Sequence, residues 1–196
     1  LSIEEGTPLH ARLLSGRMAA PDPDLAADMV EWAAERLARA GLEQYEISNW
    51  AAPGHACQHN VHVWRNEPYL GFGAGAHGCA GRVRYENIAS PDEYIARLSA
   101  QQEARPFPLS AAAAMATALD AAEEMADTMI LGLRLTEEGV DPMAFLGRFG
   151  RDVWDVYGSA LDRLLAHGLI ERSASGAVRL TKRGRLLGNH VFSEFV

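Results

Sequence analysis

The stretch DVWDVYGSALDRLLAHGLIERSASGAVRLT, residues 152–181, decides the fold of the C-terminal part of this chain. Apolar side chains recur in it at helical spacing as far as Gly168, which predicts one helix. The remaining residues form two short β patterns around Ser175 and Gly176, a pair typical of turns. A helix that leads directly into a β-ribbon is typical of a winged-helix module.

The flanking segments supply the other helices of such a module. We predict helices over residues 120–135 (DAAEEMADTMILGLRL), 141–150 (DPMAFLGRFG) and 182–195 (KRGRLLGNHVFSEF). Three helices, a ribbon and a closing helix predict a helical, winged-helix-like domain over residues 105–196. The two prolines of ARPFPLS, residues 104–110, mark its expected boundary.

Residues 1–104 alternate between helical and β patterns. Helices are expected at 7–16, 21–41 and 90–101, and strands at 42–50, 69–78 and 82–90. Thr7 is the expected N-cap of the first helix, and Asp22 or Asp24 that of the second. A helix followed by a strand is half of a β/α repeat, so the expected fold class is α/β (α+β).

The bulk composition narrows the function classes. The 196 residues carry a formal net charge of −8, and a chain without a basic half is a poor candidate for coating nucleic acid. The two cysteines make no disulfide framework and indicate a reducing compartment, which predicts a cytoplasmic location. No apolar run approaches the ~18 residues of a membrane span, and the sequence does not indicate peripheral contact with a membrane.

A winged-helix module also invites a DNA-binding hypothesis. Its candidate recognition helix, residues 152–167, carries three aspartates against Arg163. A helix that enters a DNA groove needs cations that face the phosphates. Residues 136–196 hold as many acidic as basic side chains, so we predict no nucleic-acid partner.

Histidines crowd into one short stretch, HACQHNVHVW, residues 55–64. His55, Cys57, His59 and His62 are each competent zinc or iron ligands. A structural zinc site, however, joins ligand pairs from two separated segments, whereas these residues share one expected loop. We therefore predict no dedicated metal site. The alternative is that these are loop histidines, which are exposed or cap the local backbone.

The glycine run GFGAGAHG, residues 71–78, contains the G-x-G-x-x-G spacing of a nucleotide-binding loop. A helix should follow such a loop, and here a strand pattern follows, so dinucleotide binding is not predicted. The glycines instead permit a ligand to approach bare backbone at the end of a strand, where β/α barrels keep their chemistry.

Several stretches together resemble one protein family. YEISNWAAPGHACQHNVHVWRNEPYLGFGAGAHG, residues 45–78, is similar to the C-terminal half of the radical-SAM oxygen-independent coproporphyrinogen III oxidase-like proteins, and most similar to the HemW-type heme chaperones among them. IEEGTPL at 3–9, MILGLRLTEEGVD at 129–141 and LTKRGRLLGNHVF at 180–192 match in the same order. The resemblance covers essentially the whole chain.

This resemblance implies that residues 1–104 are the C-terminal part of an incomplete radical-SAM β/α barrel. The chain begins at Leu1 rather than at a methionine, and the family's CxxxCxxC loop, which holds a [4Fe–4S] cluster and S-adenosylmethionine, is expected in the preceding part of the parent protein. Cys57 and Cys79 lie 22 residues apart and cannot supply three thiolates. Both cofactors are therefore expected in the intact parent alone, and this chain by itself is expected to be inactive in radical chemistry.

The segment HNVHVW, residues 59–64, aligns with the family motif H-N-x-x-Y-W, which is associated with heme binding in the chaperones. The resemblance therefore implies heme contacts for His59, Asn60 and Trp64, with His59 as axial ligand through a neutral imidazole nitrogen. Val63 stands at the tyrosine position and removes a polar group beside the porphyrin. The alternatives are that His59 hydrogen-bonds the loop together and that Trp64 is a core residue.

The resemblance also implies contacts with S-adenosylmethionine in the intact protein for Gly73, Gly75, Ala76 and His77. The alternative for His77 is that its ring merely closes the barrel mouth. Glu46 and Asn49 precede the histidine cluster and are candidates to line the barrel. Because they are three positions apart, their side chains lie on opposite faces of a regular strand, and both can point inward only if the strand bends.

Three hypotheses about function follow. The first is a heme chaperone, in which the barrel part binds heme or porphyrin and the helical domain contacts a heme-recipient protein. The second is an enzyme, a coproporphyrinogen dehydrogenase that oxidatively decarboxylates coproporphyrinogen III with S-adenosylmethionine. The third is a protein-interaction module without activity of its own. No catalytic residue is predicted within the chain.

Overall fold

The computed structural model describes residues 3–100 and 104–196. Contacts divide the chain into two compact units, Leu1–Glu43 and Gln44–Val196. The first unit holds helices α1 (Pro8–Leu14) and α2 (Pro23–Arg39), capped by Thr7 and Asp22 as predicted. Apolar side chains that recur at helical spacing along α2 are exposed, among them Leu25, Met29 and Trp32.

The second unit begins with two short strands, β1 (Glu43–Glu46) and β2 (Asn49–Ala51), which form a two-stranded sheet. One strand over residues 42–50 was expected, and this is wrong because the chain turns at Ile47 and Ser48. Helix α3 (Gln58–Trp64) follows where a loop was expected. The histidine cluster therefore includes a helix, which fixes the directions of His59 and His62 relative to one another.

A three-stranded antiparallel sheet comes next, in the order β3-β4-β5. Its strands are β3 (His77–Ala80), β4 (Val83–Asn87) and β5 (Ala113–Ala118), with helix α4 (Pro91–Ser99) between β4 and β5. The predicted strand over residues 69–78 is largely irregular. In that segment Tyr69 bridges to Cys79, but Phe72 is 82% exposed. The sheet takes strands from both sides of residue 104, and the predicted domain division there stays a prediction.

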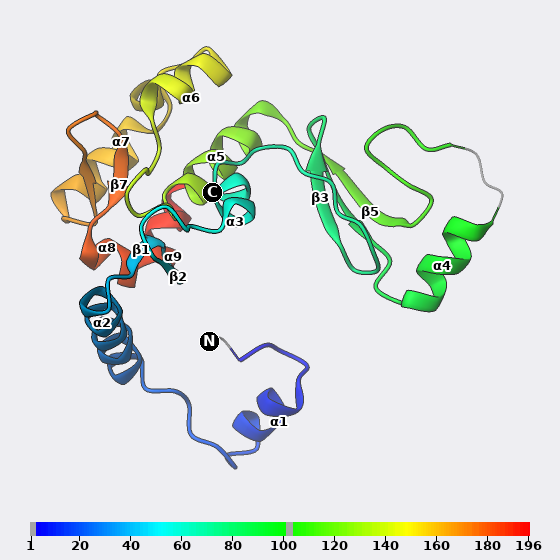
Figure 1. The fold of residues 1–196 in the computed structure, drawn as a ribbon, viewed down its shortest axis with the longest axis horizontal. Helices are drawn as coiled ribbons and strands as arrows, with labels where there is room; N and C mark the ends of the chain where they lie inside the picture. Colours follow the sequence, from blue (N-terminus) through cyan, green and yellow to red (C-terminus); the bar gives the residue numbers. More distant parts are fainter. Residues whose placement is uncertain (1–2, 101–103) are drawn as a thin grey trace. The chain divides into compact units, whose positions relative to one another are not determined.

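The remaining elements form the winged-helix-like module, as predicted (Figure 1). They are α5 (Ala121–Gly132), α6 (Pro142–Phe149), α7 (Val153–Ala166), the antiparallel ribbon of β6 (Ile170–Arg172) and β7 (Val178–Leu180), then α8 (Lys182–Leu186), α9 (Gly188–Phe192) and a 3-10 turn at Ser193–Phe195. A single closing helix was expected over 182–195, but the backbone breaks it at Leu187, where φ is −107° and ψ is 26°.

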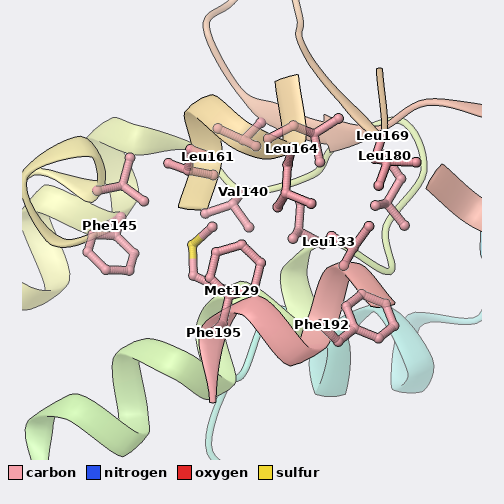
Figure 2. Close-up of a cluster of buried hydrophobic side chains, with 14 of the residues drawn as sticks. Met129, Leu133, Val140, Phe145, Leu161, Leu164, Leu169, Leu180, Phe192 and Phe195 are labelled. Atoms are coloured by element: carbon pink, nitrogen blue, oxygen red, sulfur yellow. The ribbon is translucent and has the colours of Figure 1, made fainter. Parts of the chain in front are cut away.

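The apolar core of the second unit lies inside this module (Figure 2). Met129 on α5 and Leu133 at its C-cap face Leu161 and Leu164 on α7, and none of the four is more than 1% exposed. Burial of each such side chain stabilises the fold by about 1.5–3 kcal/mol. Phe192 and Phe195 close the cluster from the C-terminus, so the module carries most of the burial that holds the chain together.

The observed architecture is a mixed helix-and-sheet fold, which confirms the predicted class. No closed barrel is formed by the residues that the structure describes, and the pairings β3–β4, β4–β5 and β6–β7 are all antiparallel. Among the described helices, none has the length and apolar character needed to cross a membrane.

The close packing of α8 gives a test of the module. A Cβ atom added at Gly184 would lie 1.9 Å from the carbonyl oxygen of Leu169, so we expect Gly184→Ala to lower the free energy of unfolding by about 1–3 kcal/mol through overpacking. Gly158→Ala is the matched control. It lies within α7 with no atom within 4 Å of its added Cβ and should raise stability by up to about 1 kcal/mol. Equal effects in urea denaturation would contradict the packing described here.

Candidate functional site

Helix α3 is fixed to the protein by one face. Val61 is buried, and Asn60 donates from Nδ2 to the hydroxyl of Tyr45 over 3.3 Å. Trp64, one turn beyond Asn60, is half-buried. Helix α3 contacts α5, which lies beside it in Figure 1. These contacts leave the other face of α3 at the surface.

His59 lies on that outer face. Each residue turns an α-helix by about 100°, so His59, two positions before Val61, points to the opposite side. Its side chain is exposed, and no hydrogen bond engages its ring within the described part of the chain. The alternative role, in which the His59 ring stabilises its own segment through a hydrogen bond, therefore has no contact to support it. The imidazole is free to bind an external ligand.

The other candidates of the cluster are differently placed. Both ring nitrogens of His62 have oxygen partners, since Nδ1 lies 2.6 Å from a carboxylate oxygen of Glu67 and Nε2 lies 2.9 Å from the carbonyl oxygen of Pro68. His55 and Cys57 are exposed in the segment before α3. Nowhere in residues 3–100 and 104–196 do three His, Cys, Asp or Glu side chains gather as a metal site would require. These three residues are neighbours of His59 rather than its partners.

Trp64 packs against the winged-helix-like module. The guanidinium carbon of Arg134 lies 4.6 Å from the centre of the Trp64 ring and 5.4 Å from that of Phe192. Such cation–π contacts contribute about 0.5–2 kcal/mol. The indole Nε1 of Trp64 is buried without an acceptor within the described residues. Asn60 and Trp64 thus point into the protein while His59 points out, and the assignment of all three to one heme contact stays a prediction.

The end of α3 is tied to the module by polar contacts. Arg65 forms two parallel hydrogen bonds of 2.8 Å with the carboxylate of Glu138, and this pairing raises the pKa of the Arg65 guanidinium. Asn66 donates to the hydroxyl of Thr128 over 3.0 Å. These contacts join the end of α3 to α5 and to the segment that follows α5, so the helix cannot rotate freely about its axis.

The two-stranded sheet is attached to the same region through its backbone. The amide of Ile47 donates to the carbonyl oxygen of Arg134 over 3.1 Å, and the amide of Thr136 donates to that of Tyr45 over 3.2 Å. The hydroxyl of Thr136, which is fully buried, donates to the carbonyl oxygen of Gln44. This short antiparallel pairing positions Tyr45, which in turn contacts Asn60 on α3.

Glu46 is a fully buried carboxylate beside this pairing. Asn49 Nδ2 donates to its Oε1, whereas Oε2 has no hydrogen-bond partner among the described residues. The turn at Ile47 and Ser48 brings Glu46 and Asn49 together. In a regular strand these two side chains would lie on opposite faces, so such a bend is needed for them to meet. They line no barrel in this structure.

The glycine segment is held by hydrogen bonds from its own chain. The amide of Gly73 donates to the hydroxyl of Tyr94 over 3.1 Å, and the amide of Gly75 donates to the carbonyl oxygen of Ile88 over 2.9 Å. Both glycines have positive φ values, 104° and 68°, which side chains rarely tolerate. The two amides are thus already satisfied, and contacts of Gly73, Gly75, Ala76 and His77 with S-adenosylmethionine stay a prediction.

Asn87 organises this segment, and sequence reasoning missed it. Its side chain is 2% exposed, and Nδ2 donates to the carbonyl oxygens of Gly71 and Gly73 over 3.2 and 3.0 Å. Alternation along β4 places Val83, Tyr85 and Asn87 on one face. In the sequence, Asn87 falls at a position of the alternating pattern that is otherwise apolar, and this could have revealed its buried role. His77, at the start of β3, is exposed and pairs across the sheet with Glu86.

Comparison with known proteins agrees with this architecture. Residues 119–187 match the model of the HemN C-terminal domain family. The chain is 37% identical over 196 residues to the heme chaperone HemW of Bacillus subtilis, covering 100% of the chain and 49% of that protein. It is 35% identical over 192 residues to HemW of Mycobacterium tuberculosis H37Rv, covering 97% of the chain and 44% of that protein. The chain thus spans about half the length of the curated relatives it matches.

A solved structure shares the fold. The coproporphyrinogen III oxidase HemN from Escherichia coli, described as a radical SAM enzyme, superposes with a TM-score of 0.65. The superposition covers 89% of this chain and 42% of that one at 16% identity. These matches define the class to which the chain is similar. Residues 119–187 match the HemN C-terminal domain family, and the whole chain is similar to proteins named heme chaperone HemW.

The residues of this chain do not fit a [4Fe–4S] cluster. A cluster of this kind needs at least three thiolates from one protein, and the sequence contains two cysteines. Cys57 is exposed at the start of α3, whereas Cys79 is half-buried in β3. These two thiols therefore cannot hold such a cluster by themselves.

The two thiols should differ in reactivity. Burial raises the pKa of the Cys79 thiol, so a smaller fraction of it is thiolate at a given pH. We expect Cys79 in a Cys57→Ser variant to react with a disulfide reagent at pH 8 more slowly than Cys57 in a Cys79→Ser variant. Equal rates in absorbance measurements would show that β3 opens readily and would contradict this placement of Cys79.

The role of Asn87 gives a second test. Asn87→Ala leaves two carbonyl oxygens of the glycine segment without their donor, which should lower the free energy of unfolding by about 1–3 kcal/mol. Asn189→Ala, at an exposed position of α9, is the control and should change stability by less than about 0.5 kcal/mol. Thermal or urea denaturation measures both, and an unchanged stability for Asn87→Ala would refute the bonding described here.

Proposed function

We propose that this chain is the heme-binding C-terminal part of a heme chaperone. One observation carries the proposal: His59 presents an exposed ring, without a partner among the described residues, on a helix that is fixed by its other face. The similarity of the whole chain to proteins named heme chaperone supports the same assignment.

A neutral imidazole nitrogen of His59 would serve as axial ligand to the heme iron. The outer face of α3 is open, so heme can reach His59 and leave it without the opening of a buried cavity. Val63, one turn after His59 and half-buried, would offer an apolar contact beside the porphyrin where the family motif has a tyrosine. An accessible, singly ligated site suits a protein that takes up heme and passes it on.

The proposal extends to the parent protein. S-adenosylmethionine and a [4Fe–4S] cluster would be bound through the part that precedes this chain, and Gly73 to His77 would contribute to the S-adenosylmethionine side. The winged-helix-like module would contact the heme-recipient protein. Two free cysteines favour a reducing compartment, so we place the protein in the cytoplasm. An intact parent that formed vinyl groups from coproporphyrinogen III would contradict the chaperone assignment.

A hemin titration followed at the Soret band tests the role of His59. We expect saturable binding to this chain, weakened about tenfold or more in His59→Ala, which corresponds to about 1.4 kcal/mol or more. His55→Ala is the matched control, because His55 is also exposed but lies before α3, and it should bind hemin as the unmodified chain does. Equal affinities for the unmodified chain and His59→Ala would rule out the proposed axial ligand.

A further inference from the structure

A cavity of about 320 Å³ lies within the second unit, beside α9 and the turn after β1. Its lining includes Ile47, Arg134, Arg185, Leu187, His190 and Phe192. The volume falls at the lower end of the range of small-molecule sites. His59 does not line it, so the cavity is distinct from the outer face of α3.

Arg134 gives this cavity an unusual cation. Its guanidinium carbon lies over the rings of Trp64 and Phe192, so the faces of the group are covered. None of its guanidinium nitrogens donates to an acceptor within the described residues, and Nε is buried. Stacked guanidinium groups keep their N–H edge for in-plane hydrogen bonds, which match the two oxygens of a carboxylate.

The other half-buried arginines contrast with Arg134. Arg97 lies 2.5 Å from a carboxylate oxygen of Glu93, and Arg179 lies 2.8 Å from one of Glu171. Arg185 donates to the side chain of Gln44 over 2.9 Å and has a carboxylate oxygen of Glu137 at 3.7 Å. In the part of the chain that the structure describes, Arg134 has no such acceptor. A half-buried cation without an anion is costly, and a bound anion would offset that cost.

The charge around the cavity favours an anion as well. Arg134, Arg185 and His190 line it, and no aspartate or glutamate is among the described lining residues. Burial lowers the pKa of the Arg185 guanidinium, which shows that this cation too is poorly solvated. Both guanidinium groups would gain from a negative charge placed between them.

Most of the remaining wall is apolar, with Asn189 as its polar member. Ile47, Leu187 and Phe192 line it, and Leu187 is 43% exposed. A small inorganic anion would leave these side chains without contact. A ligand with an anionic group at one end and an apolar body at the other can pair with the arginines and contact the apolar side chains at the same time.

We propose that this cavity binds an amphiphilic carboxylate, with its carboxylate on Arg134 and its apolar body against Leu187 and Phe192. The assignment goes beyond heme ligation by His59 and does not depend on it. Two sources share this chemistry: a free aliphatic acid, and a propionate side chain of heme itself.

Calorimetric titration with sodium octanoate tests the proposal. We expect saturable binding to the unmodified chain and at least tenfold weaker binding to Arg134→Gln. Arg172→Gln is the matched control, because Arg172 also stacks on a tryptophan, with its guanidinium carbon 3.7 Å from the ring of Trp154, but does not line the cavity. Octanoate that does not bind, or that binds equally to both variants, would overturn the proposal.

A second variant guards against a folding defect in Arg134→Gln. His190 is exposed on α9, so His190→Glu should keep the melting temperature while its new carboxylate repels the ligand, again weakening octanoate at least tenfold. Unchanged binding in this variant would also overturn the site. Acetate lacks the apolar body and should not displace octanoate at equal concentration; displacement would contradict the apolar wall.

Hemin then distinguishes the two sources. If hemin displaces octanoate from the unmodified chain but not from His59→Ala, a heme propionate occupies the cavity. If octanoate binding is indifferent to hemin, the ligand is a separate aliphatic acid. Either result is consistent with a carboxylate site at Arg134. If His59→Ala loses hemin binding but still binds octanoate, the heme site at His59 and the carboxylate site at Arg134 are separate.

Discussion

A short antiparallel pairing between Tyr45–Ile47 and Arg134–Thr136 is the constraint on which the site depends. Its two backbone hydrogen bonds, with the buried hydroxyl of Thr136 on the carbonyl oxygen of Gln44, join the start of the second unit to the winged-helix-like module. Because Tyr45 also bonds Asn60, the pairing sets the rotation of α3. The same contact places Arg134 against Trp64 and beside the cavity.

The pairing therefore gives α3 two faces with different tasks. The inner face carries Asn60, Val61 and Trp64, which satisfy hydrogen-bonding and packing needs of the fold. The outer face carries His59, whose ring is exposed and makes no hydrogen bond within the described residues. A side chain that contributes nothing to packing on a well-anchored helix is suited to a ligand, since binding and release cost the protein no rearrangement. In the proposed function, stability and heme ligation thus fall on opposite sides of one helix.

The sequence predicted the winged-helix-like module well, because its signals are local: helical spacing and a turn between two short strands. Prediction from the sequence failed for elements whose structure depends on contacts with residues far away in the chain. Neither residue of the turn at Ile47 and Ser48 is a glycine, proline or asparagine, and the N-cap of α3, Cys57, makes no side-chain cap hydrogen bond. Strand β5 consists mostly of alanine, a poor strand former, and forms because β4 supplies the hydrogen bonds.

For the site, the motif alone named His59, Asn60 and Trp64 but could not say which way each points. That depends on Val61 being buried and on Arg134, which lies 70 positions from Trp64 in the sequence. The glycine run was expected to let a ligand approach bare backbone, and this stays a prediction. In the structure the chain itself approaches Gly71, where a Cβ would have no room beside the carbonyl oxygen of His77. Asn87 was readable in principle from its phase along β4.

The measurement that tests this account most directly is an amide NMR titration with substoichiometric hemin, whose ferric iron broadens nearby resonances. The account predicts that residues 58–64 broaden first, with the outer face around His59 more affected than the amides of the module core at 129–133 and 161–164. Broadening that begins in the module, or that is uniform along the chain, would contradict a heme site on α3.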